Sequence, residues 1–146
     1  MTQPYFAAQG GLRFECTGCG DCCRKPGPVF FPGPELERAA QALELSLREF
    51  RRRYRVTRVD GVTAIDPGNV PCPFLLEDGR CRIYEARPTQ CRTFPFWPEV
   101  AITERSWRKA AKDCEGIGRG PVHPPQVIAT HLAACHDVGL PHDDPW

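Results

Sequence analysis

Apolar and polar residues between positions 36 and 54 follow the alternating three-and-four spacing of an amphipathic helix. The apolar positions on this face are Leu36, Ala39, Ala40, Leu43, Leu47, Phe50 and Tyr54. Pro34 suits the first turn of a helix. Ser46 and Glu49 have the spacing of a capping box, which marks a helix start. The pattern therefore predicts either one long helix or two consecutive helices with a break near Leu45.

In residues 56–65 the pattern of apolar and polar residues changes to a period of two, and the pair Asp60-Gly61 interrupts this alternation. An Asp-Gly pair between two such stretches is typical of a tight β-hairpin turn. A second strand–turn–strand pattern covers residues 74–84 around Glu77-Asp78-Gly79, and it would present Cys81 beside its turn. The sequence therefore predicts two short hairpins.

Shorter elements are predicted around these hairpins. Residues 29–31 read as an extended segment, residues 85–92 as one helical turn or a tight loop, and residues 106–112 and 125–136 as helices. Residues 93–98 form an aromatic, proline-stiffened segment, which we expect either to cover a metal site or to belong to an ordinary hydrophobic core. The helical and alternating segments are segregated and do not follow a βαβ order, which indicates an α+β fold.

Four of the nine cysteines fall within eight residues, in Cys16-Thr-Gly-Cys19-Gly-Asp-Cys22-Cys23. Thiolates are soft, strongly donating ligands, and a Cys-x2-Cys step brings two sulfurs from one tight loop to one metal ion or cluster corner. Four further cysteines follow at Cys72, Cys81, Cys91 and Cys114, so folding must bring them to the site. The pattern predicts a small metal-stabilised domain with peripheral helices, short β-hairpins and cysteine-bearing loops, in which metal binding and folding are coupled.

The net charge and the hydropathy of the sequence exclude several other classes of protein. A formal net charge of +1 gives no global attraction to nucleic acid or anionic lipid. No stretch approaches the roughly 18 apolar residues of a membrane span, and the first residues lack the basic and apolar regions of a secretory signal. We therefore expect a cytoplasmic protein without a membrane or nucleic-acid partner. Cytosolic thiols stay reduced, which favours metal ligands over the alternative of a disulfide framework.

The ordered cysteine motifs resemble the YkgJ-type cysteine-cluster family, which has a CxxCxxCC signature and eight cysteines. The motifs are Cys16-x2-Cys19-x2-Cys22-Cys23, Cys72-Pro73-Phe74-Leu75, Gly79-x-Cys81-x-Ile83-Tyr84, Arg87-Pro88-x2-Cys91-Arg92-x-Phe94-Pro95 and Cys114-x-Gly116-Ile117-Gly118. The resemblance implies a zinc- or iron-chelating domain. Its implied metal ligands are Cys16, Cys19, Cys22, Cys23, Cys72, Cys81, Cys91 and Cys114. The chain departs from the family at Glu115, where proline is common.

The resemblance covers residues 14–118. We expect a single metal-binding domain over residues 1–146, with a family-like core at 14–118 and a C-terminal helical extension at 121–146.

Eight thiolates would fill two tetrahedral sites or two four-cysteine clusters, so two centres are expected. Cys22 and Cys23 would serve different centres or bridge two metals, because successive side chains diverge. The cysteine pattern fits both zinc and an iron–sulfur cluster as the cofactor. The Cys-x2-Cys-x2-Cys step resembles a ferredoxin opening and slightly favours iron–sulfur, whereas Cys23 interrupts that pattern and four-thiolate zinc is chemically as good.

Either kind of centre would be anionic, and nearby cations would offset its charge. The candidates are Arg24, Lys25, Arg80, Arg82, Arg87 and Arg92, each with ordinary solvated surface as the alternative.

Two smaller groups of residues carry weaker signals. His131 and Cys135 stand four apart on the predicted last helix, where the apolar neighbours favour core packing over metal ligation. The run Arg51-Arg52-Arg53-Tyr54-Arg55, with Arg58, would suit RNA or another acidic partner, but cations at a helix C-terminus are also favoured by the helix dipole and by solvent.

The sequence contains no nucleophile elbow, phosphate loop or dinucleotide fingerprint, and a fully ligated metal has no open position for substrate. We therefore predict a metal-binding protein acting in electron transfer, metal handling or structural support. The alternatives are an iron–sulfur redox enzyme or accessory electron-transfer subunit, and a zinc-stabilised protein- or RNA-interaction module. Metal ions are the predicted partners, and the sequence identifies no particular redox or protein partner.

Overall fold

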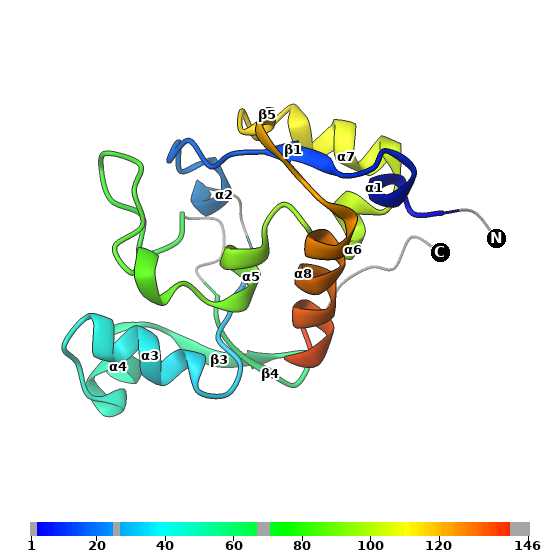
Figure 1. The fold of residues 1–146 in the computed structure, drawn as a ribbon. Coiled ribbons are helices and arrows are strands. Elements are labelled where there is room, and N and C mark those ends of the chain that lie inside the picture. The colour runs from blue at the N-terminus through cyan, green and yellow to red at the C-terminus, as the bar shows by residue number, and fades with distance from the viewer. Residues whose placement is uncertain (1–2, 25–26, 67–70, 141–146) are drawn as a thin grey trace. The chain divides into compact units, whose positions relative to one another are not determined.

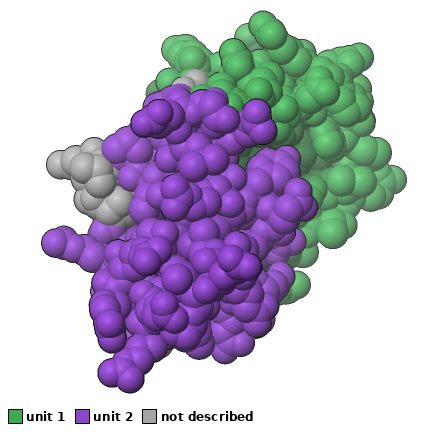
Figure 2. Space-filling view, turned by 90° about the vertical axis from the view of Figure 1, so that its left-hand side faces the viewer, with its two compact units in different colours: residues 1–19, 93–137, 141–146 green, residues 20–92, 138–140 purple. Residues whose placement is uncertain are grey.

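The computed structural model describes residues 3–24, 27–66 and 71–140, and its helices and short antiparallel strands form the predicted α+β fold (Figure 1). The chain divides into two compact units, coloured separately in Figure 2. Unit 1 contains described residues 3–19 and 93–137, and unit 2 contains described residues 20–24, 27–66, 71–92 and 138–140. The single domain over 1–146 stays a prediction. Residues 141–146 of its expected extension, and Lys25, lie outside the described residues.

Unit 1 combines an antiparallel pair of strands with helices. Strand β1 (Leu12–Phe14) pairs with β5 (Ile117–His123), with a register shift between Arg13 and Phe14. The helices of this unit are α1 (Tyr5–Ala8), α6 (Pro98–Ala101), α7 (Glu104–Ala111) and α8 (Pro125–Asp137). Helices α7 and α8 confirm the two predicted C-terminal helices within two residues. Residues 121–123, which were assigned to the helical extension, belong instead to strand β5.

The core of unit 1 forms around Phe96, which is 2% exposed. Its ring stacks on Trp107 with centroids 6.1 Å apart, and the same cluster includes Phe6, Leu12 and Ile128. Of the two roles proposed for the aromatic segment, Phe96 thus fills the role of a core residue. Within the described ranges, no helix combines the length and apolar character that a membrane span needs.

Unit 2 contains a three-stranded antiparallel sheet in the order β2-β4-β3. Its strands are β2 (Val29–Phe30), β3 (Val56–Val59) and β4 (Val62–Ile65). Asp60 and Gly61 both have positive φ, 50° and 79°, as the two-residue turn between β3 and β4 requires. The first predicted hairpin is therefore confirmed, and β2 confirms the extended segment before the helices.

Two helices separated by a short break follow β2 in unit 2. Helix α3 (Glu35–Ala42) and helix α4 (Leu47–Arg53) confirm the two-helix version of the pattern. Ser46 Oγ accepts the Glu49 N–H at 3.1 Å, while Glu49 Oε1 accepts the Ser46 N–H at 3.3 Å. This reciprocal capping box stabilises the start of α4.

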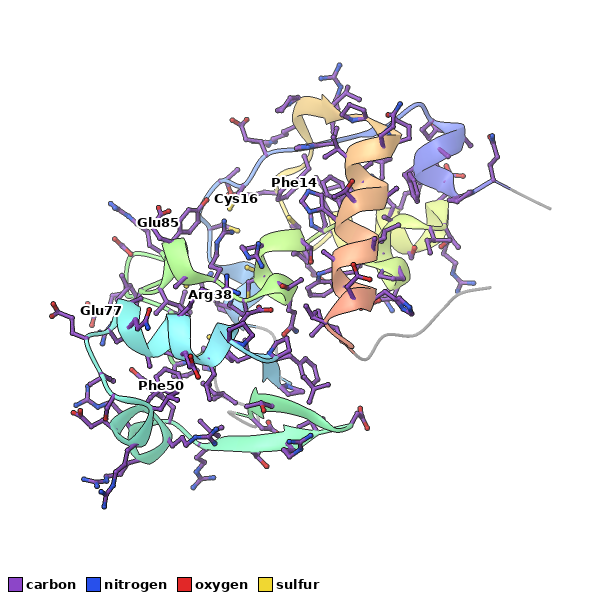
Figure 3. All side chains as sticks on the ribbon, turned by 60° about the horizontal axis from the view of Figure 1, so that its bottom comes forward. Phe14, Cys16, Arg38, Phe50, Glu77 and Glu85 are labelled. Carbon is purple, nitrogen blue, oxygen red and sulfur yellow. The ribbon has the colours of Figure 1, made fainter. Side chains whose placement is uncertain are left out.

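Three phenylalanines fill the core of unit 2. Phe31, Phe50 (labelled in Figure 3) and Phe74 are each at most 1% exposed. Their ring centroids lie 6.0 to 6.4 Å apart, within the range of favourable aromatic pairs. They come from the position after β2, from α4 and from the segment after Cys72, so this core joins the sheet region, the helices and a cysteine-bearing loop.

The second predicted hairpin forms only in part. Leu76 and Arg80 close a tight turn through the Leu76 N–H to Arg80 O bond of 2.8 Å, but the ladder is limited to an isolated bridge between Leu75 and Cys81. The chain then enters a 3-10 turn, η1 (Tyr84–Ala86), and a short helix, α5 (Thr89–Thr93). The predicted strand over residues 80–84 was therefore wrong, because Ile83 turns into the core and the 3-10 turn begins at Tyr84.

Candidate metal centre

The CxxCxxCC loop enters unit 2 through a tight turn at Gly20. This residue has φ of 78°, and a Cβ atom there would lie 2.8 Å from the Gly79 carbonyl oxygen. Only glycine permits both the positive φ and this close approach. The next residues form helix α2 (Asp21–Arg24), in which the Cys23 N–H donates to Gly20 O at 3.0 Å. The loop that carries Cys22 and Cys23 therefore lies against the turn that precedes Cys81.

Cys72 is bonded to this loop through both its main chain and its side chain. Its N–H donates to the Cys23 carbonyl oxygen at 2.7 Å. The Cys72 and Cys23 thiols are also hydrogen-bonded, and the Cys23 thiol interacts in turn with that of Cys22. Cys22, Cys23 and Cys72 thus form a continuous chain of thiol contacts.

The contact between Cys22 and Cys23 corrects the expectation that their side chains diverge. Residues 21–24 are helical, and successive side chains on a helix are about 100° apart, whereas on a strand they point to opposite faces. Two adjacent thiols can therefore approach each other, as these two do.

Short local structures hold Cys81 and Cys91 near the connected thiols of Cys22, Cys23 and Cys72. Cys81 forms the isolated bridge with Leu75, whose N–H donates to the Cys72 carbonyl at 3.1 Å. Cys91 lies in α5, where its N–H donates to Pro88 O at 3.0 Å. Burial raises the pKa of the Cys91 thiol, and negative charge on Cys22, Cys23 and Cys81 raises it further. These five cysteines of unit 2 are therefore electrostatic neighbours.

The same proximity shifts the pKa of the other thiols. The Cys23 thiol raises the pKa of Cys22 well above its ordinary value. Cys22 lowers the pKa of Cys23, but the hydrogen bond with Cys72 and burial outweigh this and raise it to about 11. The Cys23 contact lowers the pKa of Cys72, whereas burial raises that of Cys81. Without a cation, these thiols resist ionising together, because each negative charge opposes the next. A bound metal ion would favour the thiolate forms instead.

Arg87 is a cation placed to act on these thiols. Its charge favours the thiolate forms and lowers the pKa values of Cys22, Cys81 and Cys91 against the larger opposing effects. The guanidinium carbon lies 3.8 Å from the centroid of the Tyr84 ring, and Nε donates to the Tyr84 carbonyl at 2.9 Å.

The other candidate cations have different surroundings. Arg80 is exposed and pairs with Asp78 at 3.1 Å. Arg92 donates to the Arg87 carbonyl and to Thr89 Oγ1, Arg82 is exposed, and Arg24 ends helix α2. Arg87 is therefore a predicted cation with a described effect on several thiols.

Unit 1 carries the remaining predicted ligands on two neighbouring segments. Cys16 (labelled in Figure 3) and Cys19 follow β1, and Cys114 follows α7. The Glu15 N–H donates to Gly116 O at 3.1 Å, and Thr17 Oγ1 donates to Glu115 Oε1 at 2.5 Å. Glu115, the departure from the family pattern, thus joins the segment of Cys114 to that of Cys16.

His131 and Cys135 have the surroundings of core residues. The His131 ring stacks on Phe96 with centroids 5.5 Å apart. Cys135 is 2% exposed, and its sulfur lies 3.2 Å from Thr93 Oγ1. Burial raises the pKa of the Cys135 thiol. These contacts favour the core-packing interpretation.

The arginines at positions 51–53, 55 and 58 are all exposed, which agrees with the interpretation of a solvated helix end. The Arg58 guanidinium donates to the Gly61 carbonyl at 2.6 Å, so it supports the hairpin turn.

Sequence reasoning did not identify three residues that hold α5 in place. Glu35, Thr89 and Gln90 connect this helix to α3 and β2 through side-chain hydrogen bonds. A glutamate at a helix start is too common to signal such a role from the sequence.

The donor set of unit 2 fits a soft metal, since it consists of thiols with an adjacent guanidinium. Within residues 3–24, 27–66 and 71–140, no three Cys, His, Asp or Glu side chains converge in a metal-ligating geometry. The thiols of Cys22, Cys23 and Cys72 are arranged as a chain of contacts, so metal ligation would require these side chains to rearrange.

Comparison with family models identifies most of the chain. A family model described as "CxxCxxCC: Putative zinc- or iron-chelating domain" matches residues 15–115. The matched span includes all eight cysteines of the predicted ligand set and excludes Cys135. No solved structure matches the chain.

Proposed function

Because this chain belongs to the CxxCxxCC family of zinc- or iron-chelating domains, we propose that it binds zinc or iron through its clustered thiolates. The observation that carries this proposal is the chain of contacts from Cys22 through Cys23 to Cys72, with Cys81 and Cys91 as electrostatic neighbours. Unit 2 thus holds enough sulfur donors for one complete four-thiolate centre.

The remaining cysteines of the proposed ligand set are Cys16, Cys19 and Cys114. Together with the five of unit 2 they make eight thiolates, the number that two four-thiolate centres need. The division of the eight between two centres belongs to the proposal, and so does the assignment of both centres to a single domain over 1–146.

The chemistry of binding follows from the protonation of the thiols. Metals bind the thiolate, so binding releases protons from thiols whose pKa values are raised in the free protein. When bound, the metal supplies the positive charge that this group lacks, and Arg87 offsets the residual negative charge of the thiolates. Because the ligands come from segments far apart in the sequence, binding should also stabilise the folded chain.

The function also sets a requirement on the compartment. A centre of this kind needs reduced thiols, and the cytosol keeps thiols reduced through glutathione and thioredoxin. We therefore include a cytoplasmic location in the proposal.

The proposal is tested by elemental analysis and visible absorption of protein purified without oxygen. Stoichiometric zinc without colour would identify a zinc centre, whereas iron with matching acid-labile sulfide and a brown chromophore would identify an iron–sulfur centre. Cys72→Ser should lower the metal content, and Cys135→Ser, which alters a buried thiol outside the set, should leave it unchanged. Metal-free protein under these conditions, or equal metal in both variants, would overturn the proposal.

A further inference from the structure

We propose that Glu35, acting through Thr89, is a positioning residue for the Cys91 thiol. The inference rests on the proposed function, since it assigns a supporting residue to the proposed metal centre. Glu35 lies at the start of α3, 54 residues before Thr89, yet its carboxylate is bonded directly to the first residue of α5. Cys91 is the third residue of that helix.

The contact between Glu35 and Thr89 is buried and bidentate. Glu35 is 4% exposed and Thr89 is 3% exposed. One carboxylate oxygen accepts the Thr89 N–H, and the other accepts the Thr89 hydroxyl at 2.9 Å. The N–H groups of a first helical turn have no partner within the helix, and a carboxylate there also suits the helix dipole. Glu35 therefore caps α5 from a distant part of the chain.

The Thr89 hydroxyl extends this cap to a second side chain. Thr89 Oγ1 also accepts from Arg92 Nη2 at 2.9 Å, so the threonine hydroxyl connects the buried carboxylate to a guanidinium. The first turn of α5 is thus fixed by a connected set of polar contacts.

The next residue ties α5 to a second element. Gln90 Oε1 accepts the Phe30 N–H at 2.8 Å, and Gln90 Nε2 donates to Pro28 O at 3.5 Å. Residues 89 and 90 are therefore anchored to α3 and to β2, and Cys91 follows immediately. A metal site tolerates only small displacements of its ligand atoms, so residues that fix this helical turn also fix the sulfur that Cys91 can offer.

The first experiment measures zinc affinity by competition with a chromophoric chelator. Glu35→Leu should weaken zinc binding by about 10- to 100-fold, the usual effect of removing a group that orients a ligand. Glu35→Gln keeps an acceptor for the Thr89 N–H and should largely restore affinity. Glu37→Leu, on the exposed face of the same helix, should bind as the wild type does.

A double variant separates positioning from general destabilisation. If Glu35 acts through Cys91, adding Glu35→Leu to Cys91→Ser should cost no further affinity. An equal loss in both backgrounds would overturn the inference. Thr89→Val removes only the hydroxyl contact, so it provides the same comparison if Glu35→Leu fails to fold.

Alkylation of the metal-free protein, followed by mass spectrometry, tests the position of Cys91 without metal. Glu35→Leu should accelerate iodoacetamide labelling of Cys91 several-fold relative to Cys81, while Glu37→Leu should not. This shift in a protein that binds no zinc or iron would support the positioning role and reject the proposed function. Unchanged labelling and unchanged zinc affinity in folded Glu35→Leu protein would overturn the positioning role alone.

Discussion

The Cys72 N–H donates to the Cys23 carbonyl oxygen at 2.7 Å, and the thiols of the same two residues are also hydrogen-bonded. The two residues are far apart in the sequence, so this main-chain bond holds together two loops that each carry a proposed ligand. Because the bond involves no side-chain atom, it remains available when the thiols lose their protons to a metal. The sequence marks both cysteines as candidate ligands but does not show that they are close. The backbone bond holds them together.

Substitution of Gly20 should destabilise the loop that carries Cys22 and Cys23. Gly20→Ala combines a positive φ with a Cβ placed 2.8 Å from Gly79 O, so we expect roughly 2 kcal/mol or more of destabilisation. Gly18→Ala is the matched control, because Gly18 also has positive φ but open space around it, and about 1 kcal/mol is expected. Urea unfolding of both variants checks the difference, and equal losses would contradict the close approach at Gly20.

Arg87 should strengthen metal binding through its charge. Arg87→Met keeps much of the side-chain length and removes the cation near Cys22 and Cys81, so zinc affinity should fall by roughly tenfold, as for other groups that support ligands. Arg80→Met removes an exposed arginine that is paired with an aspartate and should have little effect. Competition titrations at low salt measure both, and an equal effect of the two substitutions would count against a specific role of Arg87.

The capping box of α4 should give the stability a pH dependence. The Ser46 hydroxyl and then the Ser46 N–H lower the pKa of Glu49 below its ordinary value of 4.5. Because the folded-state pKa is the lower one, the stabilisation is present above pH 4.5 and is lost as pH falls through the folded-state value. Glu49→Gln keeps the box geometry without the titration, so its unfolding free energy should change less between pH 7 and pH 3. Identical pH profiles for the variant and the wild type would be the contrary result.

Removing the metal should lower the free energy of unfolding by the amount that metal binding contributes. Free zinc at a hundred times its dissociation constant should add about 2.7 kcal/mol to the unfolding free energy. Chelation should remove this increment from the wild type, while Cys91→Ser should gain less from zinc at the same concentration. Denaturant unfolding with and without chelator measures the increment, and a wild type that is indifferent to zinc would speak against coupled binding.

Local signals predicted much of unit 2. The break between α3 and α4 follows from Ser46 and Glu49, which are three residues apart, and the first hairpin follows from Asp60-Gly61. These signals are readable because the residues that interact are close in sequence. The eight cysteines were identified by spacing and by resemblance, and all eight fall within the span that the family model matches.

Long-range pairing limited the prediction elsewhere. Strand β5 contains Gly118, Gly120 and Pro121, which weaken any strand signal, and its partner β1 lies about a hundred residues earlier. The bond from Glu35 to Thr89 joins residues that no local pattern connects. The contact between Cys22 and Cys23 depended on a short helix that the glycine-rich loop did not indicate.

X-ray absorption at the zinc or iron edge of the natively purified protein tests the central claim most directly. Thiolate ligation by the proposed cysteines predicts a first shell dominated by sulfur at about 2.3 Å, with the sulfur content reduced in Cys72→Ser. A first shell of nitrogen or oxygen at about 2.0 to 2.1 Å, unchanged in that variant, would contradict a thiolate centre in unit 2.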